Sequence, residues 1–160
     1  MNTYNIETLD TPEKCRQALR NAARAAGPIW HRKVLLQLGS LEERNFLDPL
    51  EGAFIASLVV SEQIRTEEKG RTIRSNRVRN RLKELGGGIV AMIQMLEKWA
   101  IEEKVKDGFD NLRKAGVPEY MAEYIVAYRF PERFSRRAVI AAESKLAKIG
   151  IARPQSVKAA

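Results

Sequence analysis

The sequence has very few residues suited to disulfide or metal chemistry. Its 160 residues include a single cysteine, Cys15, and a single histidine, His31. One cysteine cannot form an internal disulfide, and one residue of each kind cannot supply the usual Cys/His zinc spacings. We therefore expect a reduced Cys15 thiol and neither a metal nor a cofactor.

Long apolar stretches are also missing. The most apolar one, from Phe54 to Val60, is far shorter than the roughly 20 residues that a helix needs to cross a bilayer. The first ten residues include Glu7 and Asp10 and lack the basic and apolar regions of a secretory signal. These absences predict a cytoplasmic protein that does not engage a membrane.

The alternation of apolar and polar residues that is typical of strands does not occur, whereas helix start and stop signals are dense. We expect an all-α fold, a compact bundle of about seven or eight helices with short connections. Residues 1–150 are predicted to form one domain. Gly86–Gly88 would be either a simple turn or a hinge between 1–85 and 89–150, and 151–160 would form a flexible tail.

The expected helix boundaries follow from proline, glycine and capping residues. Asp48 before Pro49 marks one start, and Gly70 marks the end of the same helix. The first predicted helix begins at Pro12 and ends before Gly27, and the next three cover about 29–38, 49–69 and 71–85. A helix from Ile89 and a separate short helix that ends at Ala115 follow. The last two cover about 118–128 and the residues after Ser135.

Positive charge is concentrated in the middle of the chain. The protein carries 28 Lys and Arg against 20 Asp and Glu, a net charge of +8. Residues 1–60 are neutral overall, while the 25 residues from 61 to 85 carry a net charge of +4. No acidic residue interrupts the six basic positions Arg71, Arg74, Arg77, Arg79, Arg81 and Lys83.

On a helix over 71–85 these cations would flank a narrow apolar seam of Val78, Leu82 and Leu85. Arg74, Arg77 and Arg81 would form one contact row, and Arg79 and Lys83 a second one. Like charges at these spacings repel one another, and an anionic polymer would remove that repulsion. The same residues also fit a solvated face or one paired with Glu62, Glu67 and Glu68.

The sequence therefore favours a non-enzymatic nucleic-acid-binding protein that uses the arginine-rich segment 71–85. Duplex DNA is favoured over RNA, because an α-helix fits the major groove of B-form DNA. The alternative is a helical interaction or homo-oligomeric assembly module, in which the basic helix docks an acidic protein or copies associate around the apolar helix from Pro49.

Two further features of the sequence bear on function. A second basic patch comprises Arg129, Arg133, Arg136 and Arg137; it fits either a bound anion or an ordinary surface corner. His31 has no identifiable Ser or Cys partner and no evident residue to orient its ring, so we expect it to be structural rather than catalytic.

Overall fold

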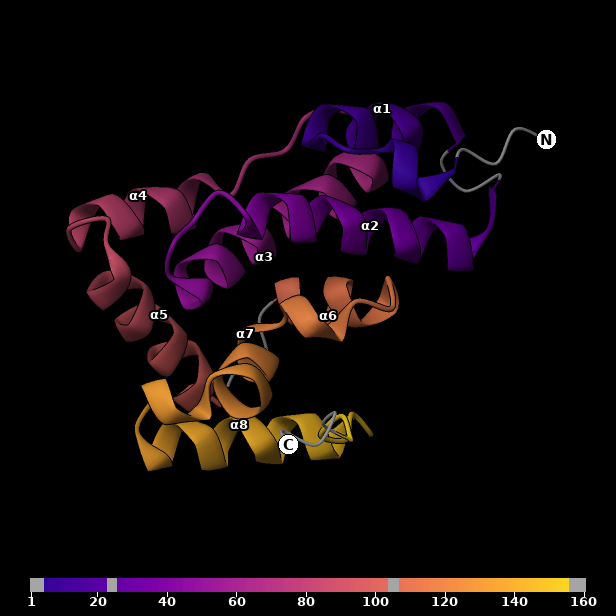
Figure 1. The fold of residues 1–160 in the computed structure, drawn as a ribbon. Coiled ribbons are helices and arrows are strands. Elements are labelled where there is room, and N and C mark those ends of the chain that lie inside the picture. Colours follow the sequence, from indigo (N-terminus) through magenta and orange to yellow (C-terminus); the bar gives the residue numbers. More distant parts are fainter. Residues whose placement is uncertain (1–4, 23–25, 104–106, 156–160) are drawn as a thin grey trace.

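The computed structural model describes residues 5–22, 26–103 and 107–155, and within them the chain is helical with no strand, which confirms the all-α prediction (Figure 1). The α-helices are α1 (Pro12–Ala22), α2 (Pro28–Glu43), α3 (Pro49–Lys69), α4 (Asn76–Glu84), α5 (Ile89–Ile101), α6 (Asp107–Lys114), α7 (Ala122–Tyr124) and α8 (Arg136–Lys148). Shorter turns are η1 (Ile6–Thr8), η3 (Pro118–Tyr120), η4 (Ile125–Arg129) and η5 (Pro131–Arg133).

Helix α3 lies at the centre of the fold. Its start and end match the sequence prediction, because the Asp48 side chain accepts a hydrogen bond from the Leu50 amide and Gly70 adopts the left-handed conformation, φ 67°. Most of its apolar side chains are buried, including Phe54 and Val60. Helices α1, α2 and α3 form the upper part of the molecule in Figure 1, while α7 and α8 form the lower part.

One buried cluster includes residues from both sides of the triple glycine. Phe54 of α3 stacks on Trp99 of α5, with 6.0 Å between the ring centroids. Gly86 and Gly87 both have positive φ and end α4 in a tight turn.

The start of the expected C-terminal tail lies against the bundle, because Tyr128 donates a hydrogen bond to the Ile151 carbonyl (2.8 Å). Residues 156–160 lie outside the described part of the chain.

Helix α2 does not end at Gly39, so the prediction of a helix over 29–38 was too short. Gly39 is buried, and a Cβ atom built on it would overlap the hydroxyl and ring of Tyr120. The glycine therefore provides room for an aromatic ring in the core, and the helix continues to Glu43.

The prediction of one continuous helix over 118–128 was also wrong. The chain forms a 3-10 turn at Pro118–Tyr120, one α-turn at Ala122–Tyr124 and a π-helical turn at Ile125–Arg129. The π turn is closed by a hydrogen bond from the Phe130 amide to the Ile125 carbonyl, 2.9 Å long.

Candidate nucleic-acid interface

The arginine-rich segment is a helix only in its second half. Residues 71–75 are not helical, and α4 begins at Asn76, so the predicted helix over 71–85 starts five residues too early. The reason is that backbone amides of this segment bond to side chains of α3. The Ile73 amide donates to Thr66 Oγ1 (2.9 Å), and the Ser75 amide donates to Glu62 Oε2 (2.6 Å).

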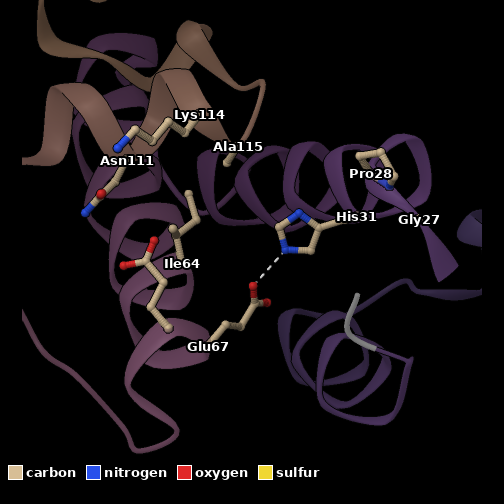
Figure 2. Close-up of a pocket in the computed structure, with 9 residues that line it drawn as sticks. Gly27, Pro28, His31, Ile64, Glu67, Asn111, Lys114 and Ala115 are labelled. Atoms are coloured by element: carbon tan, nitrogen blue, oxygen red, sulfur yellow. Dashed lines mark hydrogen bonds and ion pairs between the residues drawn. The ribbon is translucent and has the colours of Figure 1, made fainter. Parts of the chain in front are cut away.

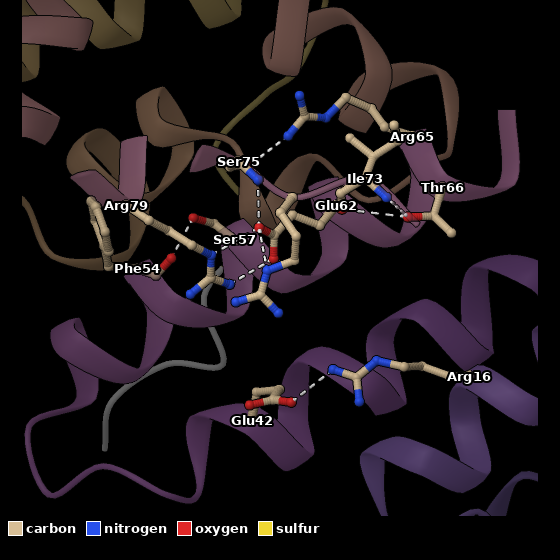
Figure 3. A network of polar contacts seen from close by, with 11 residues as sticks. Arg16, Glu42, Phe54, Ser57, Glu62, Arg65, Thr66, Ile73, Ser75 and Arg79 are labelled. Atoms are coloured by element: carbon tan, nitrogen blue, oxygen red, sulfur yellow. Dashed lines mark hydrogen bonds and ion pairs between the residues drawn. The ribbon is translucent and has the colours of Figure 1, made fainter. Parts of the chain in front are cut away.

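Glu62 is the centre of this attachment (Figure 3). Its two carboxylate oxygens accept hydrogen bonds from Arg79 Nε (2.8 Å) and from a terminal nitrogen of the same guanidinium (2.6 Å). Nε of Arg74 lies 3.9 Å from the same carboxylate. Arg65 of α3 adds a hydrogen bond to the Ser75 hydroxyl. One buried carboxylate thus fixes both the approach to α4 and its first turn against α3.

The electrostatics of Glu62 agree with this geometry. Burial acts to raise its pKa, but the hydrogen bonds from Arg79 and the Ser75 amide, with the charges of Arg79 and Arg74, hold the pKa below its ordinary value of 4.5. The hydrogen bond with Glu62 in turn raises the pKa of Arg79. Both groups are therefore charged at neutral pH.

The structure separates the six predicted contact residues into different groups. Arg79 is committed to Glu62, so its guanidinium is not available for a row with Lys83. Arg74 precedes the helix and does not share a helical row with Arg77 and Arg81.

Five of the six cations remain exposed: Arg71, Arg74, Arg77, Arg81 and Lys83. Arg81 makes a 3.2 Å ion pair with Glu84 on the surface of α4, and such exposed pairs contribute little. Within the described residues, no carboxylate pairs with Arg71, Arg77 or Lys83. The expected seam of Val78, Leu82 and Leu85 is half-buried and packs against the core.

In the second basic patch, the two arginines before α8 are ion-paired. Arg129 bonds to Glu43 of α2 (2.9 Å), and Arg133 bonds to both oxygens of Asp48 (3.0 Å each). The hydrogen bond from Arg133 is the main cause that lowers the pKa of Asp48. These contacts tie the η4–η5 corner to the end of α2 and to the loop before α3.

The other two residues of that patch, Arg136 and Arg137, are exposed in the first turn of α8. The Ser135 side chain caps this helix by accepting from the Ala138 amide (3.2 Å). The patch is thus divided between two arginines that hold the fold together and two that face solvent.

His31 has a partner that the sequence did not reveal. Its Nε2 lies 2.7 Å from Oε2 of Glu67, at the edge of an open cavity of about 260 Å³ between α2, α3 and α6 (Figure 2). Gln63 also donates to Glu67 (3.0 Å). The two residues are 36 positions apart on different helices, and no local pattern links them. No Ser, Thr or Cys is among the described residues that line the cavity.

Neither a metal centre nor a membrane span is found in the described parts of the chain. No group of three His, Cys, Asp or Glu side chains could hold an ion there. None of the helices there combines the length and the apolar character needed to cross a bilayer. Cys15 is fully buried, and burial raises the pKa of its thiol to about 11.

Comparison with known protein families, curated proteins and solved structures found no match.

Proposed function

We propose that the protein binds nucleic acid without catalysing a reaction, and that α4 is the contact element. The observation that carries this proposal is the exposure of Arg77, Arg81 and Lys83 on a helix whose remaining arginine, Arg79, is fixed to Glu62. The contact residues are Arg77 and Arg81 on one flank of the apolar seam of α4 and Lys83 on the other flank, and Arg79 is a positioning residue.

The energetics favour a polyanionic partner. Among the exposed cations of α4, Arg77 and Arg81 stand four positions apart, and like charges at that spacing repel by a few tenths of a kcal/mol. Binding to phosphates removes this repulsion and releases condensed counterions. Fixing α4 to α3 before binding reduces the entropy that association would otherwise cost.

The dimensions of α4 suit a groove of duplex DNA. Its nine residues span about 13 Å at 1.5 Å per residue. The major groove of B-form DNA admits an α-helix, whereas that of A-form RNA is too deep and narrow. Arginines on such a helix contact phosphates for the most part, which positions the helix without reading sequence.

The decisive experiment measures how the affinity for a short DNA duplex depends on salt. Alanine at Arg77, Arg81 and Lys83 together should flatten the slope of log K against log salt by roughly 0.9 for each lost phosphate contact, or about 3 in total. The matched control is alanine at Lys33, Arg44 and Lys148, three exposed cations on α2, after α2 and on α8, which removes the same charge. An equal loss in both triple variants, or an unchanged slope in the first, would contradict the assignment to α4.

The alternative of a protein-assembly module has a weaker structural basis. Helix α3, the apolar helix around which copies would associate, buries most of its apolar side chains inside its own chain. The exposed large apolar residues Ile29, Val90 and Ile140 lie on three different helices, and Leu47 lies in the loop before α3; such scattered exposed apolar residues are common. Light scattering after size-exclusion chromatography, with and without the duplex, separates the two functions: a larger particle that forms only with DNA supports nucleic-acid binding.

A further inference from the structure

Beside the start of α4 lies an open cavity of about 630 Å³, here called the α1–α3 cleft. Its walls are α1, the C-terminal half of α3 and the connecting segment 70–74. This volume lies within the range of about 300–1,000 Å³ that is typical of small-molecule sites. The cleft is distinct from the outward face of α4, because neither Arg77 nor any later residue of α4 lines it.

The cleft is lined by three carboxylates, and each already has a basic partner or a hydrogen-bond donor. Glu62 holds Arg79 and the Ser75 amide. Glu67 accepts from Gln63 and lies against His31. The third, Glu13, is paired with Arg16 at 2.6 Å, and Arg16 also reaches Glu42. Two of the three carboxylates, Glu13 and Glu62, are thus paired with arginines, and the third, Glu67, has hydrogen-bond partners within the protein.

Two arginines of the cleft have no such partner. Arg20 projects from α1, and its guanidinium donates to the neutral side chain of Gln17 (2.8 Å). Arg71 lies in the connecting segment on another wall. Within the described residues, no carboxylate pairs with either guanidinium. Arg20 and Arg71, on two different walls, thus contribute the unpaired positive charge of the cleft.

Other groups around these arginines suit the rest of a small ligand. Arg74 and Thr72 also line the cleft. The Nε atom of Arg74 is 3.9 Å from the carboxylate of Glu62, which Arg79 contacts at 2.6 Å. The half-buried Ile73 provides apolar surface, whereas Leu19 and Val59 in the lining are buried. A planar guanidinium matches the oxygens of a phosphate with two parallel hydrogen bonds.

We propose that the α1–α3 cleft binds a phosphate-bearing ligand of nucleotide size, held by Arg20 and Arg71. The phosphate is carried either by a free nucleotide or by the end of an oligonucleotide. This site goes beyond the function assigned to α4, since the cleft can bind such a ligand whether or not α4 contacts a duplex.

The test is a calorimetric titration of the full chain at low salt, with inorganic pyrophosphate in one experiment and AMP in another. Saturable binding of at least one of them is expected, and the double variant Arg20→Ala/Arg71→Ala should weaken it by at least about tenfold. Both side chains are exposed and lack an acidic partner in the described structure, so the variant should melt at the wild-type temperature. The matched control is Lys33→Ala/Arg44→Ala, which removes two exposed cations elsewhere.

The outcomes separate the sources of the phosphate. If a 5′-phosphorylated hexanucleotide binds in the cleft more tightly than AMP and than its unphosphorylated form, the ligand is an oligonucleotide end; if AMP binds at least as tightly, it is a free nucleotide. Absence of saturable binding by all of these anions, or an equal loss in the control variant, would overturn the proposal. The triple variant of α4 leaves the cleft intact, so failure of one proposal is distinguishable from failure of the other.

Discussion

Replacement of Glu62 by glutamine should destabilise the protein, because it breaks the attachment of α4 to α3. The glutamine amide can still accept one hydrogen bond, but it loses the charge and the paired contact with Arg79. Removing one partner of a buried pair costs about 3–5 kcal/mol. The Glu62 side chain is 9% exposed and that of Arg79 is 26% exposed, so water compensates part of this loss, and we expect about 2–3 kcal/mol.

Urea denaturation at neutral pH measures this change. With a slope of about 2 kcal/mol per molar urea for a chain of this size, the midpoint should fall by about 1 M. The control is Glu84→Gln, which removes the exposed ion pair with Arg81 and should change stability by less than about 0.5 kcal/mol. Equal midpoints for Glu62→Gln and the wild type would refute the attachment.

The same pair of proteins gives a prediction about pH. The pKa of Glu62 is lower in the folded chain than its ordinary value of 4.5. Its contribution to stability is therefore complete above that value and is lost as the pH falls through the folded-state pKa. The difference in unfolding free energy between wild type and Glu62→Gln should shrink in acid, and a difference that stays constant there would contradict the assigned cause.

Three further predictions concern the fold. Alanine at Gly39 should cost about 1–3 kcal/mol in thermal unfolding, since its methyl group overlaps Tyr120; wild-type stability would show that the ring moves away freely. Asp48→Asn retains a helix-capping side chain but weakens the ion pair with Arg133, so a loss of about 1 kcal/mol in urea is expected, and no loss would mean that the pair contributes nothing. The buried Cys15 thiol, with its pKa of about 11, should react with a thiol reagent at neutral pH only after unfolding; rapid reaction of the native protein would show that the site opens.

Helix ends were predictable from the sequence where the signal is local. The start of α3 after Asp48 and its end at Gly70 follow from capping and backbone conformation alone. Gly39 carries the same sequence signal as Gly70, but it is buried beneath Tyr120, 81 positions later in the chain. A contact between such distant positions cannot be read from a local pattern.

The candidate interface shows the same limit. The density of basic residues from Arg71 to Lys83 was visible in the sequence, and so was the apolar seam of α4. Which arginines are free was not visible, because Arg79 is neutralised by an acid 17 positions earlier on another helix. The early start predicted for α4 has the same origin. The side chains of Thr66 and Glu62 accept hydrogen bonds from the backbone amides of Ile73 and Ser75, and these contacts hold residues 71–75 outside the helix.

The contact between Gly39 and Tyr120 also constrains how related sequences can diverge. A side chain at position 39 and a tyrosine at position 120 would occupy the same volume. Relatives that keep the aromatic ring should therefore keep glycine, and those that place alanine or serine at 39 should carry a smaller residue at 120. Substitutions at these two positions are expected to occur together.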